Sequence, residues 1–242
     1  MKWEDEGILL SVKPFGEKAT IIEVFTPSQG RYRGLVRSGI QKAFSGLLEP
    51  GSQLYLNWNA RLEEHLGVFS VEHVKSRVSQ LFGGKKALDG FNSIISLLLV
   101  SLPEREPFEL IYSTTVDLVD NIDDSQTWLR KYIQWELLLL SELGYGLDLA
   151  QCALTGSSLN LKYVSPKSGR AVSNDAAQEW KSKLLPLPTF LISNNDDEQI
   201  DLKVLEQGFR LTGYFLEKKL FNTLNRSDLP AARQRFVESI CN

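Results

Sequence analysis

The chain has 242 residues, of which 43% are hydrophobic and 24% charged, and its formal net charge is −3. This length allows one large domain or two modest ones, and the composition is that of an ordinary globular protein. No apolar run reaches the ~18 residues of a membrane-spanning helix, and the acidic N-terminus lacks the apolar segment of a secretory signal. We therefore expect a cytoplasmic protein.

Five short segments in the first 80 residues predict β-strands. Each is rich in β-branched or aromatic residues, and turn-forming Gly or Pro residues separate several of them. The segments are Ile8–Val12, Thr20–Phe25, Tyr32–Val36, Gln53–Trp58 and Val68–Val74. Their number and even spacing predict a small β-barrel or a β-sandwich.

After residue 84 the apolar residues recur at intervals of three and four, which is typical of helices. Long helices are predicted at Lys85–Leu102, Phe108–Ile122, Trp128–Leu143, Val204–Leu224 and Leu229–Ile240, and a shorter one at Asp175–Leu184. The stretch Cys152–Asp175 is polar and reads as irregular. The pattern thus predicts an α+β fold, in which an all-β domain at 1–80 precedes a mainly α-helical domain at 81–242 with an irregular loop at about 150–175.

The sequence lacks the motifs of the common enzyme classes. There is no phosphate-binding loop, no nucleophile elbow and no zinc-protease motif, and His65 and His73 have no partner at ligand spacing. The acidic cluster Asp117, Asp120, Asp123 and Asp124 could bind a hard cation, although the glycine and closing glutamate of a calcium loop are missing. A solvated helix end is the simpler interpretation, and we expect neither catalysis nor a cofactor.

Basic residues gather in the segment Ser28–Leu48, which contains no acidic residue. Arg31, Arg33 and Arg37 would project from one face of the predicted strand, and Lys42 follows them. Tyr32 and Phe44 lie close by in the sequence. Oligonucleotide-binding barrels combine a cationic groove for phosphates with aromatic rings for bases. The alternative is an ordinary barrel in which the arginines form a solvated face and the aromatic rings belong to the core.

A second basic set lies near the C-terminus and comprises Lys218, Lys219, Arg226, Arg233 and Arg235. Two predicted helices and a turn bring these residues within reach of one another. Such a set could bind DNA or an acidic segment of a partner protein, and a solvated face is again the alternative.

Several segments follow one another in an order and spacing that carry a family resemblance. They are Asp5–Val12, Phe15–Glu17, Ile22–Thr26, Leu35–Gly39, Leu54–Trp58, Leu138–Leu149, Cys152–Gly156 and Tyr163–Arg170. Together they resemble the recombination mediator O (RecO) family of DNA repair proteins over essentially the whole chain. The resemblance implies that the N-terminal barrel is an oligonucleotide-binding (OB) fold and that a helical domain follows it.

The resemblance also implies an activity and a set of partners. RecO proteins bind single- and double-stranded DNA and anneal complementary strands. With RecR they help to load RecA onto strands coated by the single-stranded DNA-binding protein, whose acidic C-terminal tail they contact. Such a protein would act at the nucleoid, and none of these steps requires it to hydrolyse ATP.

The resemblance implies that Arg37 and Lys42 bind DNA. Arg37 lies where relatives have Lys or Arg before a glycine, and Lys42 lies in the basic stretch that follows. Local charge adds Arg31 and Arg33 to the predicted DNA-binding residues, with Lys13 and Arg61 as weaker candidates. Charge complementarity alone assigns the acidic tail to the C-terminal basic set.

The chain departs from the family pattern at a metal site. Many RecO proteins carry four zinc-binding cysteines after the turn that ends the third long helix. Here Cys152 occupies the first position, Thr155 the second, and residues 169–173 contain no cysteine. Because structural zinc takes about four ligands, we predict no metal, and a loop held by packing and hydrogen bonds.

Two other functions stay open on the sequence. The first is a protein-interaction adaptor without appreciable DNA affinity. The net negative charge of residues 81–242, which contain seventeen basic and twenty-one acidic residues, favours it. A metal-dependent nuclease or hydrolase could use the carboxylates of Asp117–Asp124.

Overall fold

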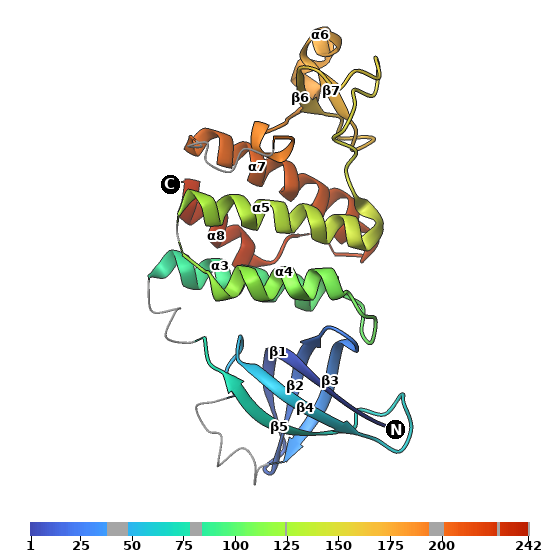
Figure 1. Ribbon diagram of the computed structural model, residues 1–242, viewed down its shortest axis with the longest axis vertical. Coiled ribbons are helices and arrows are strands. Elements are labelled where there is room, and N and C mark those ends of the chain that lie inside the picture. The colour runs from blue at the N-terminus through green and yellow to red at the C-terminus, as the bar shows by residue number, and fades with distance from the viewer. Residues whose placement is uncertain (38–47, 78–83, 124, 194–200, 227, 242) are drawn as a thin grey trace. The chain divides into compact units, whose positions relative to one another are not determined.

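The computed structural model describes residues 1–37, 48–77, 84–123, 125–193, 201–226 and 228–241 (Figure 1). The chain forms two compact units, Met1–Ile122 and Asp123–Asn242. The predicted α+β class is confirmed, with five strands preceding the helices. The sequence pattern places a division near residue 80, where strands give way to helices, whereas the first compact unit includes two further helices.

Five strands form a closed barrel in the first unit, in the order β1-β2-β3-β5-β4. They are β1 (Lys2–Phe15), β2 (Ala19–Thr26), β3 (Gly30–Arg37), β4 (Gln53–Asn59) and β5 (Val68–Lys75). All neighbouring pairs are antiparallel except β3 and β5, which meet in parallel at Leu35 and Val68. The predicted strands are confirmed, and a barrel forms rather than a sandwich.

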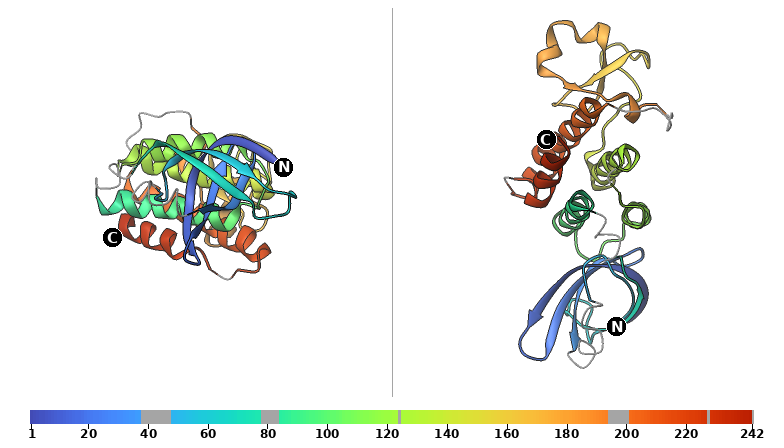
Figure 2. Two further views of the ribbon diagram at one scale, coloured as in Figure 1. Left: turned by 90° about the horizontal axis from the view of Figure 1, so that it is seen from below. Right: turned by 90° about the vertical axis from the view of Figure 1, so that its left-hand side faces the viewer.

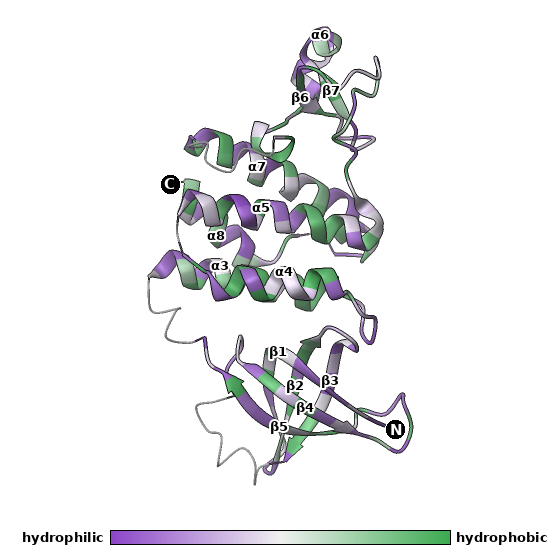
Figure 3. Cartoon of the chain, viewed as in Figure 1, coloured by the Kyte–Doolittle hydropathy of each residue, from purple (hydrophilic) through white to green (hydrophobic). Residues whose placement is uncertain are grey.

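Hydrophobic and hydrophilic residues are interspersed along the strands of the barrel (Figure 3). Because successive side chains of a strand point to opposite faces, their order decides which residues fill the barrel. In β3, Tyr32, Gly34 and Val36 are buried, while Arg33 and Arg37 face solvent. A Cβ atom at Gly34 would lie only 2.5 Å from the Phe69 ring. The barrel therefore closes between β3 and β5 because this position carries no side chain.

Two helices, α3 (Lys85–Ser101) and α4 (Glu109–Asp120), lie across one end of the barrel (Figure 2). The segment between them is attached to the start of β3, since Arg105 N donates to the Arg31 carbonyl at 2.8 Å. Gly30, at φ +68°, permits this approach, because a Cβ there would overlap the Glu106 backbone. The Tyr112 ring of α4 packs edge-on against Phe25, so these helices share the barrel's packing.

The second unit is built on α5 (Gln126–Leu140), α7 (Leu202–Phe215) and α8 (Ala231–Cys241). The first two continue as short π-helical turns, η1 (Ser141–Tyr145) and η4 (Leu216–Phe221). Ser125 caps α5 by accepting a hydrogen bond from Trp128 N. Aromatic rings form much of the core between the helices, with Tyr132 packed against Phe209 and Phe236.

A small module between α5 and α7 contains a three-stranded sheet in the order β7-β6-β8. Its elements are β6 (Leu161–Val164), β7 (Ala171–Ser173), α6 (Asn174–Ala177), η2 (Gln178–Lys183), β8 (Leu185–Pro186) and η3 (Thr189–Leu191). The prediction of an irregular stretch was wrong at β6 and β7, which are too short to show an alternating pattern. The predicted helix at 175–184 is one α-helical turn followed by a 3-10 helix.

Within the described ranges, no helix combines the length and apolar character needed to cross a membrane.

Candidate nucleic-acid interface

Arg31 lies on the outer side of β3, but its guanidinium is used within the fold. Its Nη1 donates to Glu23 at 2.8 Å and its Nε to the Leu102 carbonyl at 2.9 Å. Only 14% of the side chain is exposed, and Glu23 is buried beside it. Arg31 thus connects β2, β3 and the end of α3. The prediction that Arg31 contacts a phosphate was therefore wrong.

Tyr32 belongs to the barrel core. It is 4% exposed, and its ring lies 5.1 Å from those of both Trp3 and Trp58. The guanidinium of Arg105 sits over the same ring at 4.8 Å. The prediction that Tyr32 stacks on a base was therefore wrong, because even-numbered positions of β3 point inward.

The other predicted cations of the barrel differ in how far they are neutralised. Arg33 is half exposed and forms a 2.6 Å ion pair with Glu104. Lys13 is 70% exposed and lies 3.6 Å from Glu23. Arg37 and Arg61 are exposed, and within the described residues neither forms an ion pair with a carboxylate. Lys42 and Phe44 lie outside the described residues.

Arg37 borders a depression of about 630 Å³ on the outer surface of the barrel, between side chains of β1, β3, β4 and β5. Tyr55 of β4 also lines it and is 36% exposed as a residue. The Tyr55 hydroxyl donates to Glu4 at 2.9 Å, and Asn57 donates to the same carboxylate at 2.5 Å. The hydrogen bond to Glu4, together with its charge, raises the pKa of Tyr55. This network holds an aromatic ring at the surface beside the exposed side chain of Arg37.

The sequence pattern indicates that Tyr55 faces outward, although Tyr55 is not among the predicted site residues. Leu54, Leu56 and Trp58 alternate with Tyr55 and Asn57, so an inward-facing apolar set implies that the two polar positions face outward. The depression also contains Lys2, another cation that charge counting in the basic segment missed.

The depression is electrically balanced. Lys2 and Arg37 contribute positive charge, and Glu4 and Glu72 contribute negative charge. Long-range attraction of phosphates would therefore depend on the neighbouring cations. Amide and carboxylate groups within the depression are suited instead to hydrogen bonds with the polar edges of a ligand such as a nucleobase.

Arg233, from the C-terminal basic set, is buried in the second unit. It is 4% exposed, and its Nε and Nη2 donate to the two oxygens of fully buried Glu136 at 2.6 and 2.9 Å. Burial lowers the pKa of Arg233, but the charge of Glu136 outweighs this effect and raises it overall. The prediction that Arg233 contacts an acidic partner was wrong, because its charge is satisfied inside the helical core.

The remaining members of the set lie nearer the surface. Lys218 is paired with neighbouring Glu217, and Arg226 and Arg235 are exposed. Lys219 is half-buried, and its Nζ donates to the Lys167 carbonyl at 3.2 Å. This bond links η4 to the loop between β6 and β7.

Asp120, from the acidic cluster, forms ion pairs with two basic residues at the end of the barrel. Asp120 accepts hydrogen bonds from buried Arg77 at 2.5 Å and from Lys75 at 2.8 Å. Partial burial raises the pKa of Asp120, but these bonds outweigh it and hold the pKa below its usual range. Asp124 lies outside the described residues, and within them no group of three or more His, Cys, Asp or Glu could hold a metal.

The loop after Cys152, where the family resemblance implies a zinc site, is held by hydrogen bonds. Cys152 Sγ accepts from Ser173 N at 3.3 Å, and the Cys152 backbone pairs with Ser157 and Gly156. Burial raises the pKa of the Cys152 thiol, but hydrogen bonds from Thr155 and Ser173 lower it to about 6. One sulfur with hydroxyl and amide neighbours does not fit a structural zinc site. Cys152 and Cys241 are both free cysteines.

Comparisons with known proteins agree with this architecture. The model of the N-terminal domain of recombination protein O matches residues 1–77, and that of its C-terminal domain matches residues 87–228. Proteins named DNA repair protein RecO are 45% identical over 240 residues in Ruegeria sp. (strain TM1040) and 47% identical over 241 residues in Roseobacter denitrificans. Each alignment covers 99% of this chain and 98% of the relative. The chain therefore belongs to the recombination protein O family.

Proposed function

We propose that this chain is a DNA-binding mediator of recombinational repair that promotes strand pairing without covalent catalysis. Its family is one of DNA repair proteins of the recombination pathway. In this proposal the chain binds single- and double-stranded DNA and anneals complementary strands. With RecR, it loads RecA onto strands coated by the single-stranded DNA-binding protein. It does so in the cytoplasm, at the nucleoid, and needs no cofactor.

The exposed ring of Tyr55, fixed beside Arg37 in the barrel depression, is the observation that carries this proposal. Stacking of a base on an aromatic side chain contributes roughly 1–3 kcal/mol and tolerates any base sequence. Asn57 and Glu4 supply hydrogen-bonding groups beside the ring. Only an unpaired base exposes its Watson–Crick edge, so this surface favours single-stranded DNA.

Phosphate contacts complete the interface and extend it to duplex DNA. Arg37, Arg61 and Lys13 are exposed cations on the same barrel. Each phosphate that a cation neutralises releases counterions, which favours binding most at low salt. A protein that screens the phosphates of two strands lowers the repulsion between them, so that annealing needs no catalytic group.

The contact with an acidic tail is proposed for the cations of the C-terminal set that remain near the surface. These are Lys218, Lys219, Arg226 and Arg235. Carboxylates approaching them would be attracted through water and screened by salt, so this contact would contribute mainly to the rate of association.

Fluorescence anisotropy with a labelled single-stranded oligonucleotide, measured across a salt series, tests the DNA-binding proposal. We expect Tyr55→Ala to weaken binding by about tenfold or more, whereas Tyr55→Phe retains the ring and most of the affinity. Arg37→Ala should lower the slope of log K against log salt by about one. Arg33→Ala is the matched control, because Glu104 already neutralises that side chain.

An annealing assay on the same preparations completes the test. Variants that lose affinity for single strands should anneal complementary strands more slowly. Folded wild-type protein that binds no oligonucleotide at low salt would contradict the proposal and favour an adaptor that binds only proteins. Unchanged binding by Tyr55→Ala and Arg37→Ala would move the DNA site away from this depression. Metal-dependent cleavage of the oligonucleotide would contradict the absence of catalysis.

A further inference from the structure

Arg105, in the connection between α3 and α4, has a backbone conformation that arginine rarely adopts. Its φ is +62°, which is uncommon for a residue with a side chain and persists only where the surrounding contacts fix it. The Arg105 amide donates to the Arg31 carbonyl at 2.8 Å, and the residue is half-buried. The backbone at Arg105 is therefore fixed against the start of β3.

The guanidinium of Arg105 contacts a ring of the barrel and a loop at the same time. It lies over Tyr32, with its central carbon 4.8 Å from the centre of the ring. Its Nη1 donates to the Glu63 carbonyl, and its Nη2 donates to the His65 carbonyl at 3.1 Å. Both carbonyls belong to residues 60–67, which form the β4–β5 loop. A planar group with several donors can make these contacts together, whereas a lysine ammonium is a point charge on a flexible stem.

The middle of the β4–β5 loop is attached to the rest of the barrel through Arg105. Residues 61–65 are all exposed. Within the part of the chain that the structure describes, the two hydrogen bonds from Arg105 are the only ones that join these residues to another segment. The end of the loop is anchored separately, because Trp58 Nε1 donates to the Leu66 carbonyl at 3.1 Å. Loss of the guanidinium would therefore free residues 61–65 without separating the strands.

The same loop borders the depression that is proposed to bind DNA. Asn59, before the loop, and Val68, after it, both line that depression. Arg61 is an exposed cation of the loop and is one of the proposed phosphate contacts. Arg105 does not line the depression, and both of its Nη groups donate to the loop. Any effect of Arg105 on a strand bound there would pass through the loop.

We propose that Arg105 is a positioning residue of the DNA interface, which fixes the β4–β5 loop so that Arg61 meets the phosphates of a single strand bound in the depression. The inference rests on the proposed DNA binding of the barrel. A loop that is fixed before binding loses less conformational entropy when DNA binds, and this raises the affinity. One half-buried cation thus orients another cation that is exposed.

Replacement of Arg105 by lysine separates positioning from direct contact with DNA. Arg105→Lys keeps the positive charge, so a phosphate contact would survive it, but a single ammonium cannot replace the planar fork that holds the loop. We expect the affinity for a labelled single-stranded oligonucleotide, measured by fluorescence anisotropy at low salt, to fall by about fivefold. Arg105→Gly should give a similar loss. Glycine adopts a positive φ without strain, so this second variant keeps the backbone of the connection.

Coupling between Arg105 and Arg61 tests whether the effect passes through the loop. In the wild-type background, Arg61→Ala should lower the slope of log K against log salt by about one. In the Arg105→Lys background the same substitution should lower the slope less, because the loop no longer holds Arg61 at a phosphate. Lys86→Gln removes an exposed charge of α3 outside the loop and the depression. It is the matched control and should bind DNA like the wild type.

Two measurements report the state of the loop without DNA. Trypsin should cleave after Arg61 faster in both Arg105 variants than in the wild type, because cleavage requires local opening of the chain. Trp58, which is 1% exposed and bonded to the end of the loop, should become more accessible to the fluorescence quencher acrylamide. Circular dichroism and thermal melting establish that each variant is folded.

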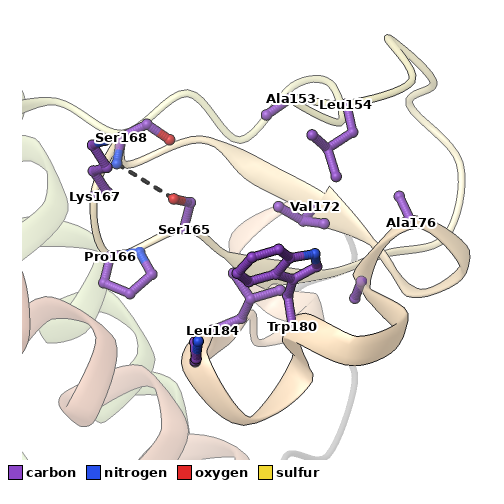
Figure 4. A pocket seen from close by; sticks show the side chains of 12 residues that line it. Ala153, Leu154, Ser165, Pro166, Lys167, Ser168, Val172, Ala176, Trp180 and Leu184 are labelled. Carbon is purple, nitrogen blue, oxygen red and sulfur yellow. Dashed lines mark hydrogen bonds between the residues drawn. The ribbon is translucent and has the colours of Figure 1, made fainter.

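The quenching measurement needs a background without Trp180. This residue lines a pocket of about 470 Å³ in the small module of the second unit and is 58% exposed (Figure 4). Its indole would be quenched in every variant and would mask the change at Trp58. Trp180→Phe removes that signal and changes no residue of the barrel.

The outcomes separate this inference from the proposed DNA binding. Weaker DNA binding by both Arg105 variants, with faster cleavage after Arg61, supports the inference. If Arg105→Lys binds DNA like the wild type and Arg105→Gly does not, Arg105 is a phosphate contact and the inference is overturned. Unchanged DNA affinity or unchanged cleavage in both folded variants also overturns it and leaves base stacking on Tyr55 intact. Wild-type protein that binds no oligonucleotide overturns the proposed function itself, and this inference with it.

Discussion

Arg31 in the first unit and Arg233 in the second are both members of basic clusters in the sequence, and both turn toward a carboxylate of their own unit. The two ion pairs differ in how far they are buried. Arg233 is 4% exposed and its partner Glu136 is fully buried. The Arg31 side chain is 14% exposed and that of its partner Glu23 is 8% exposed. Their neighbours Arg37 and Arg235 are exposed.

A basic cluster in the sequence therefore contains two kinds of cation. Some pair with a carboxylate inside the fold, and others stay exposed and can bind a ligand. The extent to which each ion pair is buried should decide how much the free energy of unfolding depends on that pair. Removing one member of a fully buried pair leaves an uncompensated charge without water, whereas solvent relieves part of that cost near the surface. We therefore expect substitution of Arg233 to reduce stability most, substitution of Arg31 less, and substitution of Asp120 least.

Arg233→Ala should destabilise the protein most. Glu136 would lose both of its hydrogen bonds to Arg233 in the helical core, at an expected cost of about 3–5 kcal/mol in the free energy of unfolding. Urea unfolding measures this change. Arg235→Ala, the exposed neighbour, should stay within about 0.5 kcal/mol of the wild type. Equal effects of the two substitutions would contradict the buried pair.

Arg31→Ala should have an intermediate effect. It removes the hydrogen bonds to Glu23 and to the Leu102 carbonyl, at an expected cost of about 1–3 kcal/mol. Arg37→Ala should leave stability within about 0.5 kcal/mol and reduce DNA affinity instead. If Arg31→Ala proved as stable as Arg37→Ala and lost more DNA affinity, Arg31 would be a phosphate contact after all.

Asp120, whose side chain is 26% exposed and pairs with Arg77 and Lys75, should give the smallest effect, visible as a pH dependence. Its folded-state pKa lies below its ordinary value of 3.8, so its carboxylate stabilises the fold above that value. This stabilisation is lost as the pH falls through the lowered pKa. We expect Asp120→Asn to lose stability near neutral pH and to have a flatter acid limb in unfolding experiments.

The double substitution Arg77→Ala/Asp120→Asn isolates the contribution of the pair. In the Arg77→Ala background, Asp120→Asn should change the acid limb much less than it does in the wild type. An equal change in both backgrounds would mean that the acid sensitivity arises elsewhere in the barrel.

The order of the longer strands and helices can be predicted from the sequence, because the period at which apolar residues recur reflects the local geometry of the backbone. The alternation in β3 also showed that Arg33 and Arg37 face outward. The same alternation in β4 was sufficient to place Tyr55 at the surface. It failed for β6 and β7, since strands of three or four residues contain too few positions to define a period.

Which charged side chains stay exposed to a ligand depends on how distant elements pack. Glu136 is 97 residues from Arg233 in the sequence, and the Leu102 carbonyl is 71 residues from Arg31. No local pattern reports such pairs, because they form only when distant elements pack together. The pocket beside Trp180 likewise joins several short segments of the small module. Long-range packing therefore selects, from the cations and aromatic rings of the sequence, those that can meet a ligand.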